Sequence, residues 1–539
     1  MQQPEWLYTF EKSGRRGERK PLSRLFEYGT ATFGSRTAIS DGEATYTYDQ
    51  LELGAQRIAA LLHSSGVGPA MRVAVLTSKR AYIPMFAAAI WKLGAVYVPL
   101  DSNNPLARTE RLIHLLQPAA VIGEGADLVP HKQEMGQFST PQLLACAASE
   151  SAERWSTYSQ VDEAEPAYII FTSGSTGTPK GVMISHGSLL DYFYNHNQVL
   201  RFTSDSRVLS FAPFHFDVSI EDTLLPLSLG AFVYQYKGMP IGVLVRRVLK
   251  QHRITHIIAV STILTVITDG NSPLNSSVLP DLEMVMTGAE LCDPKVINTW
   301  KTNFPKARVL NVYGPTETTI VCTAYTIEHP DENRSKAYPI GRPLDGVLMK
   351  IMGENGEITG PAQDGELWIG GSQVMIGYFN EPGETAKSVA TLDGVRYYKT
   401  GDVCCFDEDG EVVFVGRRDE EIKLAGRRIN LREISQLAGA YGSRAFAGVL
   451  DSNGKRQLAL VLVSDYGVDV LSTVRAQMSA QLPDYMRPHV LGYVDQPVLT
   501  STGKTNESQL LSLLGAAYRV QPSEQYIFGA DGSFTPHRV

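Results

Sequence analysis

The sequence has no long apolar run and no targeting segment at its start. No stretch approaches the roughly 18 uninterrupted apolar residues that a membrane-spanning helix needs. The N-terminal residues, MQQPEWLYTFEK, contain no cationic segment followed by an apolar one, so they do not read as a secretory signal. These two absences predict a cytoplasmic protein without a membrane partner.

Cysteine is scarce, and its spacing argues against two common uses of this residue. The 539 residues include five cysteines, an odd number without a C-x-x-C pair, which indicates neither a disulfide framework nor a zinc site. The 11 histidines are scattered and never take the H-E-x-x-H spacing of a zinc hydrolase. The formal net charge of −8 disfavours binding to nucleic acid or to an anionic membrane surface.

Apolar segments alternate between strand and helix patterns through most of the chain. Residues 72–76 read as a buried strand, 81–93 as an apolar helix and 95–98 as a second strand, which together predict a βαβ unit. Because the alternation recurs over about 400 residues, we expect an α/β fold of parallel sheets covered by helices. From Gly365 onward the segments become shorter and predict a small β-rich subdomain. The final part mixes strand and helix patterns, as in a small α+β domain.

A loop rich in glycine and hydroxyl residues follows a strand-like run in YIIFTSGSTGTPKGVMIS, residues 168–185. Gly174 and Gly177 allow backbone conformations that bring N–H groups close to an anion, and Lys180 adds a charge suited to phosphate oxygens. The loop is not a Walker A element, because the lysine does not directly follow the second glycine. We interpret it as a phosphate-binding loop, and the alternative is a solvated Ser/Gly linker. The hydroxyl donors are Thr172, Ser173, Ser175, Thr176 and Thr178.

Further motifs occur in a fixed order along the chain. They are NVYGPTETT (residues 311–319), GELWIGG (365–371), YKTGD (398–402), GRRDEEIKLAGRRI (416–429) and TGK (502–504). Together with the phosphate loop, they resemble the adenylate-forming superfamily and, within it, the amino-acid adenylation domains of nonribosomal peptide synthetases. The resemblance covers nearly the whole chain, and so many motifs in one order do not arise by chance.

The resemblance implies that the chain uses ATP and Mg²⁺ and has three catalytic residues. Lys504 would bridge the substrate carboxylate and the phosphate, Thr316 would contact the α-phosphate, and Glu317 would bind Mg²⁺. Tyr313 would stack on adenine, and Asp402 would accept both ribose hydroxyls. The ATP-binding residues implied in this way are Thr172, Ser173, Gly174, Ser175, Thr176, Gly177, Lys180, Gly288, Ala289, Glu290, Asn311, Tyr313, Gly314, Asp402, Phe414 and Arg417.

The resemblance also divides the chain into two domains. Residues 1–418 would form the adenylation core, and residues 419–539 a small mobile domain that carries the catalytic lysine. Asp419 would be the hinge at which this domain rotates between adenylation and thioester formation. No G-[GD]-[HD]-S carrier motif follows Lys504, so the expected partner is a separate carrier protein with a phosphopantetheine thiol. By the same resemblance the chain would serve antibiotic biosynthesis, either alone or as part of a longer synthetase.

One carboxylate indicates the substrate class that the resemblance implies. Asp217, in FAPFHFDVSIED, matches the aspartate that pairs with the α-ammonium group of an amino acid. An acyl-CoA ligase of the same superfamily is the main alternative, but the acids that it activates have no such group. A catalytically silent protein with the same fold is disfavoured, because Lys180, Glu317, Asp402 and Lys504 are all retained.

Glu221 departs from the family pattern, in which tryptophan often occupies this pocket position. A lone carboxylate in an apolar pocket is costly without a partner, so we predict a cationic substrate such as lysine or ornithine. In the alternative, Glu221 bonds to the protein and the substrate is a small neutral amino acid. A β-amino acid also fits, because Asp217 can meet an ammonium group one carbon farther along. The other pocket residues implied are Val218, Thr262, Met286, Gly288, Val312, Ile320 and Val321.

Overall fold

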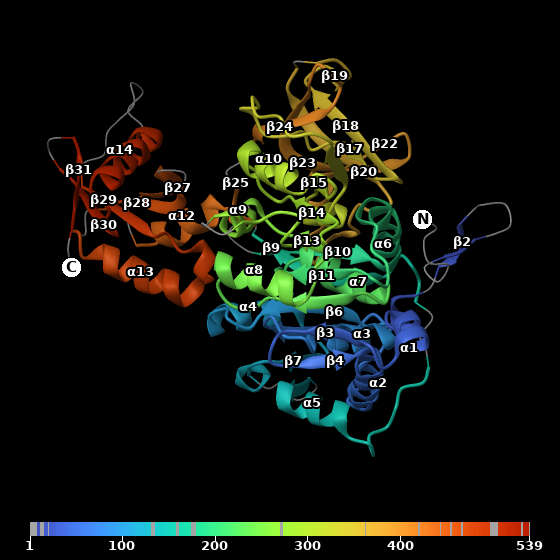
Figure 1. Cartoon of the computed structure of the whole chain (residues 1–539). Helices are drawn as coiled ribbons and strands as arrows, with labels where there is room; N and C mark the ends of the chain where they lie inside the picture. The colour runs from blue at the N-terminus through green and yellow to red at the C-terminus, as the bar shows by residue number, and fades with distance from the viewer. Residues whose placement is uncertain are drawn as a thin grey trace. The chain divides into compact units, whose positions relative to one another are not determined.

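The computed structural model divides into two units by the contacts within the chain (Figure 1). The first unit comprises Met1–Ser102, Ile113–Phe171 and Gly181–Arg418, and the second comprises Asn103–Leu112, Thr172–Lys180 and Asp419–Val539. The structure describes residues 8–10, 16–19, 21–130, 135–157, 161–173, 179–269, 273–361, 363–418, 421–441, 444–452, 455–464, 467–495, 505–529 and 532–537.

A seven-stranded sheet of the first unit contains the predicted βαβ unit. The sheet has the order β21-β10-β9-β6-β5-β7-β8, and β5 pairs in parallel with both β6 and β7. The helix α3 (Ile83–Lys92) connects β5 to β6 and is buried along its whole length, as expected for a helix that is apolar on all sides. The strands are β5 (Arg72–Thr77), β6 (Val96–Asp101), β7 (Ala120–Gly123), β8 (Gly136–Ser139), β9 (Pro166–Thr172), β10 (Lys180–Ser185) and β21 (Gly377–Tyr378).

A nine-stranded sheet forms the second large layer of this unit. Its order is β17-β16-β15-β14-β13-β11-β12-β3-β4, and the strands from β15 to β3 in that order are parallel. The carboxyl ends of parallel strands meet at one edge, where ligands of α/β proteins usually bind. The strands are β3 (Thr37–Ser40), β4 (Thr45–Thr47), β11 (Arg207–Ser210), β12 (Phe232–Gln235), β13 (His256–Ile258), β14 (Met284–Thr287), β15 (Arg308–Tyr313), β16 (Thr323–Ile327) and β17 (Arg342–Pro343).

The β-rich subdomain that the sequence predicted from Gly365 onward is present, although it begins earlier, at β18. Its main strands run in the order β19-β18-β20-β23-β22, and β24 pairs with β23. The strands are β18 (Val347–Gly353), β19 (Gly356–Ile358), β20 (Gly365–Gly371), β22 (Val389–Leu392), β23 (Val395–Phe406) and β24 (Val412–Arg417). A separate ribbon pairs β1 (Tyr8–Phe10) with β2 (Arg16–Arg19).

Helix starts in this part of the chain follow local capping chemistry. Thr47 and Gln50 form a reciprocal capping box at the start of α2, and the Ser185 side chain accepts the Ser188 N–H at the start of α6. None of the helices in the described ranges is both long enough and apolar enough to span a bilayer. The helices up to residue 418 are η1 (Leu22–Arg24), α1 (Glu27–Phe33), α2 (Tyr48–Ser64), α3, α4 (Leu106–Leu116), η2 (Ala126–Leu128), α5 (Thr140–Ala148), α6 (His186–Leu200), η3 (Ile220–Leu224), α7 (Leu225–Ser228), α8 (Gly242–Gln251), α9 (Ser261–Thr268), α10 (Pro294–Asn303), η4 (Thr316–Thr318) and α11 (Pro382–Ser388).

The second unit is the small α+β domain that the sequence predicted. Its sheet has the order β27-β28-β29-β30-β31. A hairpin of β25 and β26 turns at Ala425 and Gly426, whose φ angles of 50° and 73° are both positive, as in a type I′ turn. The elements are β25 (Glu421–Leu424), β26 (Arg427–Asn430), α12 (Leu431–Gly439), β27 (Arg444–Ser452), β28 (Lys455–Val463), α13 (Val470–Gln481), η5 (Asp484–Met486), β29 (Val490–Val494), α14 (Glu507–Val520), β30 (Gln525–Phe528) and β31 (Phe534–Pro536).

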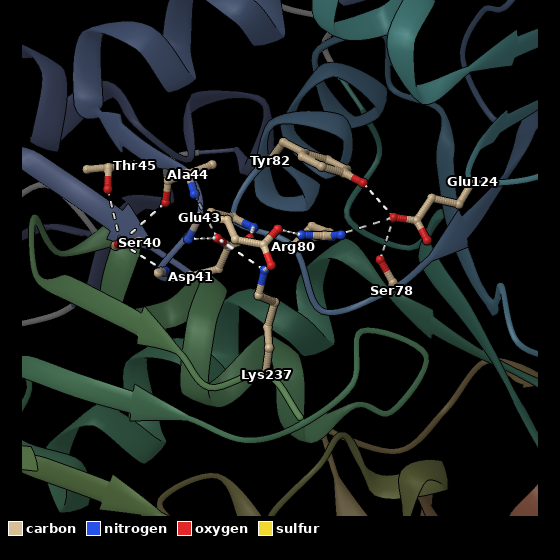
Figure 2. Close-up of polar contacts among 12 residues, drawn as sticks. Ser40, Asp41, Glu43, Ala44, Thr45, Ser78, Arg80, Tyr82, Glu124 and Lys237 are labelled. Atoms are coloured by element: carbon tan, nitrogen blue, oxygen red, sulfur yellow. Dashed lines mark hydrogen bonds and ion pairs between the residues drawn. The ribbon is translucent and has the colours of Figure 1, made fainter. Parts of the chain in front are cut away.

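Figure 2 shows a polar network in the first unit, at the ends of strands from both large sheets. Asp41 Oδ1 accepts the N–H groups of Glu43 and Ala44, each at 2.9 Å, and Oδ2 accepts the N–H of Ala81 at 3.1 Å. Lys237 Nζ lies 3.6 Å from Asp41 Oδ1 and 2.7 Å from Glu43 Oε1. Burial raises the pKa of Asp41, but these donors and Lys237 lower it by more, so the carboxylate stays ionised.

The same network continues to the end of β7. Glu124 Oε1 accepts hydrogen bonds from Ser78 Oγ at 2.6 Å and from Tyr82 Oη at 2.7 Å. Arg80 pairs with Glu43 and lies 3.9 Å from Glu124, so it joins the two halves of the network. The turn between β3 and β4 is thereby tied to the start of α3 and to the end of β7.

We expect Asp41→Ala to destabilise the protein by about 1–3 kcal/mol, because it leaves the buried N–H of Ala81 and the partly buried N–H groups of Glu43 and Ala44 without this acceptor. Glu43→Ala, in the same network, should leave the stability nearly unchanged, because the Glu43 side chain is 67% exposed. Urea unfolding of the two variants measures the difference. An equal loss in both would show that the network acts through surface charge and not through the buried acceptor.

Candidate active site

The loop that carries Glu317 follows β15 and is fixed by two neighbours. Tyr378 Oη donates a hydrogen bond to Glu317 Oε1 at 2.9 Å, and Met375 N–H donates to the Glu317 carbonyl at 2.8 Å. The Glu317 carboxylate is therefore buried in one orientation, next to the turn that begins with Thr316. An oriented carboxylate of this kind is a hard oxygen donor suited to Mg²⁺.

The backbone after this turn is strained and is held by Gln373. Thr319 and Ile320 have positive φ angles of 60° and 71°, a conformation that costs energy for residues with a β-carbon. Gln373 Nε2 donates to the carbonyls of Val321 at 2.9 Å and Thr318 at 3.2 Å, and its backbone carbonyl accepts the Thr319 hydroxyl at 2.7 Å. Gln373 thus fixes the loop on which Glu317, Ile320 and Val321 lie.

Asp402, which the resemblance assigns to the ribose hydroxyls, is buried near the end of β15. Tyr313 Oη donates to Asp402 Oδ2, and the Arg417 guanidinium pairs with Oδ1. Burial raises the pKa of Tyr313, and the Asp402 carboxylate adds to the effect, so the phenol keeps its proton. Each carboxylate oxygen can accept more than one hydrogen bond, so Asp402 retains capacity for hydroxyl donors.

Two glycines allow close backbone contacts at the ends of β14 and β15. A β-carbon on Gly288 would lie 2.7 Å from the Val312 carbonyl oxygen, and one on Gly314 would lie 2.2 Å from the Ile320 carbonyl oxygen. Both distances are too short for any other residue without a backbone shift. Gly288 therefore lets the end of β14 approach β15, and Gly314 lets the end of β15 approach the loop of Ile320.

The other residues expected at the nucleotide lie on β15, after β14 and, for Phe414, on β24. Ala289 has a positive φ of 66°, and Glu290 Oε1 accepts from Ser261 Oγ at 2.8 Å and from Thr262 N at 3.3 Å. Asn311 Nδ2 donates to the Pro339 carbonyl at 2.8 Å, which anchors a neighbouring loop. Phe414 pairs in register with Cys404, on the strand that carries Asp402.

Asp217, the residue expected to bind the substrate ammonium group, lies beside Thr316 and Glu317, two of the three expected catalytic residues. Burial raises its pKa to about 6, although hydrogen bonds from the Thr316 side chain and the Val218 N–H act in the opposite direction. The nearby carboxylates of Glu317 and Glu221 contribute to the increase. No basic side chain in the described ranges forms an ion pair with Asp217.

Glu221 has a partner in the protein, whereas the prediction of a cationic substrate assumed that it has none. Its Oε1 lies 2.8 Å from Nδ1 of His196, and both side chains are buried. Tyr192, one turn before His196 on α6, also lies against this pair and approaches Nδ1 to 2.7 Å. Glu221 belongs to η3, a single π-helical turn of a kind often found at functional sites.

The remaining residues expected in the amino-acid pocket are uncharged. Met286 and Val312 lie on the neighbouring strands β14 and β15, and both are buried. Ile320 and Val321 are buried on the loop held by Gln373, whereas Val218 is half-buried. Thr262 is exposed at the start of α9, and its N–H donates a hydrogen bond to Glu290 Oε1 in the loop after β14.

Several of the expected site residues lie outside the described ranges. They are Gly174, Ser175, Thr176 and Gly177 of the phosphate loop, the hinge residue Asp419 and the catalytic Lys504. Thr172 and Lys180 are described at the end of β9 and the start of β10, and Ser173 follows Thr172 as a buried residue.

Comparison with known proteins identifies the family of the chain. Residues 26–379 match the family model described as AMP-binding enzyme. The chain belongs to this family. Among individual relatives, syringomycin synthase SyrB1 of Pseudomonas syringae pv. syringae is 30% identical over 529 residues, which is 94% of this chain and 85% of that protein. This AMP-binding enzyme is an adenylate-forming ligase of the nonribosomal peptide synthetase type.

Some relatives of the AMP-binding enzyme are much longer than this chain. Tyrocidine synthase 3 of Brevibacillus parabrevis is 30% identical over 504 residues, which is 91% of this chain but 8% of that protein. Among solved structures, an artificially fused adenylation-PCP di-domain from Klebsiella oxytoca, NpsA-ThdA, has the same fold with a TM-score of 0.77. Its sequence is 22% identical, and the match covers 93% of this chain and 96% of the di-domain.

Four residues that position the site of the AMP-binding enzyme were not found from the sequence: Tyr192, His196, Gln373 and Tyr378. Tyr192 and His196 have helical spacing within an apolar pattern, which indicates only a shared helix face. Gln373 and Tyr378 lie outside all of the sequence motifs that resemble adenylating enzymes. Their roles depend on contacts with residues far away in the chain, so no local signal marks them.

We expect Gln373→Ala to lower the free energy of unfolding by about 1–3 kcal/mol and to reduce ATP-dependent adenylation more strongly than this loss explains. The physical reason is that the strained turn at Thr319 and Ile320 loses its anchor. Urea unfolding and adenylation kinetics measure the two effects. Gln509→Ala, at an exposed position on α14, is the control and should change neither. A stable Gln373→Ala variant with unchanged kinetics would contradict the anchoring role.

Proposed function

We propose that this AMP-binding enzyme activates an amino acid with ATP and then transfers it to the phosphopantetheine thiol of a separate carrier protein. Asp217 is the observation that carries the proposal. It is a buried carboxylate without a basic partner among the described residues, and it lies beside Thr316 and Glu317. A buried carboxylate needs a positive partner, which the α-ammonium group of an amino acid supplies.

In the first half-reaction, an oxygen of the substrate carboxylate attacks the α-phosphorus of ATP. The bond to the bridging oxygen breaks, and pyrophosphate leaves with the electron pair. Asp217 would hold the ammonium group so that the carboxylate faces the side of the site formed by Thr316. Lys504, matched by resemblance, would offset the charge that develops on the phosphate and the carboxylate.

In the second half-reaction, the carrier thiol attacks the carbonyl carbon of the aminoacyl adenylate. The thiol gives up its proton, the carbon–oxygen bond to AMP breaks, and a thioester forms. Under this proposal, residues 1–418 form the adenylation core and residues 419–539 the mobile domain, which rotates at the hinge residue Asp419. The adenylation-PCP fusion with the same fold supports a carrier protein as the partner.

Glu317 fits the role of a Mg²⁺ ligand. Its buried carboxylate is oriented by Tyr378, and no group of three or more His, Cys, Asp or Glu side chains in the described ranges is placed to hold a metal by itself. Mg²⁺ typically binds through one or two carboxylates together with substrate phosphates and water. When bound, the ion would neutralise charge on the phosphates, while Tyr378 keeps the Glu317 oxygen in position.

The contact between Glu221 and His196 changes the choice of substrate class. The prediction of a lysine-like or ornithine-like substrate assumed a carboxylate without a partner in the protein, and Glu221 has such a partner. The alternative of a neutral amino acid is therefore better supported by the structure. A β-amino acid would use the same Asp217 with its ammonium group one carbon farther from the carboxylate.

The test is ATP–pyrophosphate exchange with a panel of alanine, threonine, proline, lysine, ornithine and a β-amino acid. We expect exchange with at least one amino acid and a loss of at least about tenfold in Asp217→Ala, because the ammonium group loses its partner. Stable binding of an AMP analogue by this variant would show that it still folds. Release of AMP with coenzyme A and a simple carboxylic acid, without any amino-acid-dependent exchange, would favour the acyl-CoA ligase instead.

Asp217 also predicts a pH dependence of amino-acid binding. Its pKa is raised to about 6, and only the ionised carboxylate pairs with an ammonium group. We therefore expect the KM for the amino acid to rise by up to about tenfold per pH unit as the pH falls below about 6. Exchange kinetics between pH 5 and 8 measure this effect, with the KM for ATP as the internal control. A KM for the amino acid that does not change over this range would contradict the role of Asp217.

A further inference from the structure

A buried histidine on α6 lies against the carboxylate that departs from the family pattern. His196 Nδ1 is 2.8 Å from Glu221 Oε1, and the two side chains are 0% and 1% exposed. The Tyr192 ring lies 5.2 Å from the His196 ring, centroid to centroid. Because residues four apart lie on one face of a helix, α6 presents both rings to Glu221.

This pair lies in an acidic part of the interior. Burial raises the pKa of Asp217 to about 6 and that of Asp222 to about 7, and Glu221 adds to both increases. His196 is the one basic side chain in the described ranges that forms an ion pair with Glu221. A carboxylate at this position without a basic partner would add a further uncompensated negative charge to this region, which is the costly arrangement.

His196 removes this cost by geometry, because its Nδ1 lies 2.8 Å from Glu221 Oε1 and the carboxylate already has a basic partner in the protein. A substrate ammonium group at this position would have to displace His196 and leave its buried imidazole without the carboxylate.

We infer that His196 determines the charge of the side chain that the amino-acid pocket accepts. By keeping Glu221 neutralised, His196 makes the pocket select an uncharged side chain and discriminate against lysine and ornithine. The inference rests on the proposed amino-acid activation. His196 is a specificity residue that acts through Glu221 and takes no part in the adenylation chemistry.

The test compares cationic and neutral substrates in ATP–pyrophosphate exchange. For each variant, the charge ratio is the larger kcat/KM of lysine and ornithine divided by the kcat/KM of the best neutral amino acid. We expect a charge ratio well below one in the unaltered enzyme. His196→Asn removes the basic partner of Glu221, and the ratio should then rise by at least about tenfold.

Two further variants separate charge from packing. The double variant His196→Asn with Glu221→Gln has no carboxylate to neutralise, so its ratio should return to that of the unaltered enzyme. Glu221→Gln alone should keep a ratio within about threefold of the original. His186→Asn replaces another buried histidine of α6 and is the matched control, which should leave the ratio unchanged.

The outcomes distinguish this inference from the proposed function. If no amino acid supports exchange in the unaltered enzyme, the proposed function itself fails. If exchange occurs but lysine or ornithine is preferred, and Glu221→Gln abolishes that preference, Glu221 pairs with the substrate and the inference is wrong. A uniform loss for all substrates in His196→Asn, with an unchanged ratio, would assign His196 to packing alone and also overturn it. If His196→Asn does not fold, His196→Gln replaces it, and the same rise in the charge ratio is expected.

Discussion

A carboxylate in the protein interior must have a positive partner or several hydrogen-bond donors, and this requirement organises the site. Asp402 has Arg417 and the Tyr313 hydroxyl, Glu317 has the Tyr378 hydroxyl, and Glu221 has His196. Asp217 has the Thr316 side chain and a backbone N–H, but no basic partner in the described ranges. Asp402 and Glu221 thus each have a basic partner in the protein. Under the proposed function, Mg²⁺ and the ammonium group of the substrate supply the positive charge at Glu317 and Asp217.

The partners come from segments that are far apart in the sequence, so the site depends on the arrangement of the sheets. Parallel strands bring their carboxyl ends to one edge, which places the turn of Glu317 after β15 and the loop of Gly288 after β14. Gln373 and Tyr378, which lie outside the nine-stranded sheet, then fix this turn through hydrogen bonds. A strained backbone at Thr319 and Ile320 persists because these contacts hold it.

Much of the fold and part of the site could be predicted from local sequence patterns. The βαβ unit at residues 72–98 appears as β5, α3 and β6, because strand and helix periods differ and α3 is apolar on every side. The motif at Tyr313 to Glu317 could be located because its residues are adjacent in the chain. The partner of Glu221 could not be predicted in this way. From the sequence we expected Glu221 to be a carboxylate without a partner in the protein. In the structure, Nδ1 of His196 on α6 lies 2.8 Å from Glu221 Oε1.

The sequence by itself determined the reaction class, because the motifs that resemble adenylating enzymes are short and continuous and keep their chemistry wherever the chain places them. It also determined the alternation of strands and helices, which is a local periodic property. Only the tertiary structure decided which of the described buried carboxylates have a basic partner in the protein and which do not. That distinction depends on distances of a few ångströms between separate elements, because the interaction of two buried charges depends on their separation and on the exclusion of water.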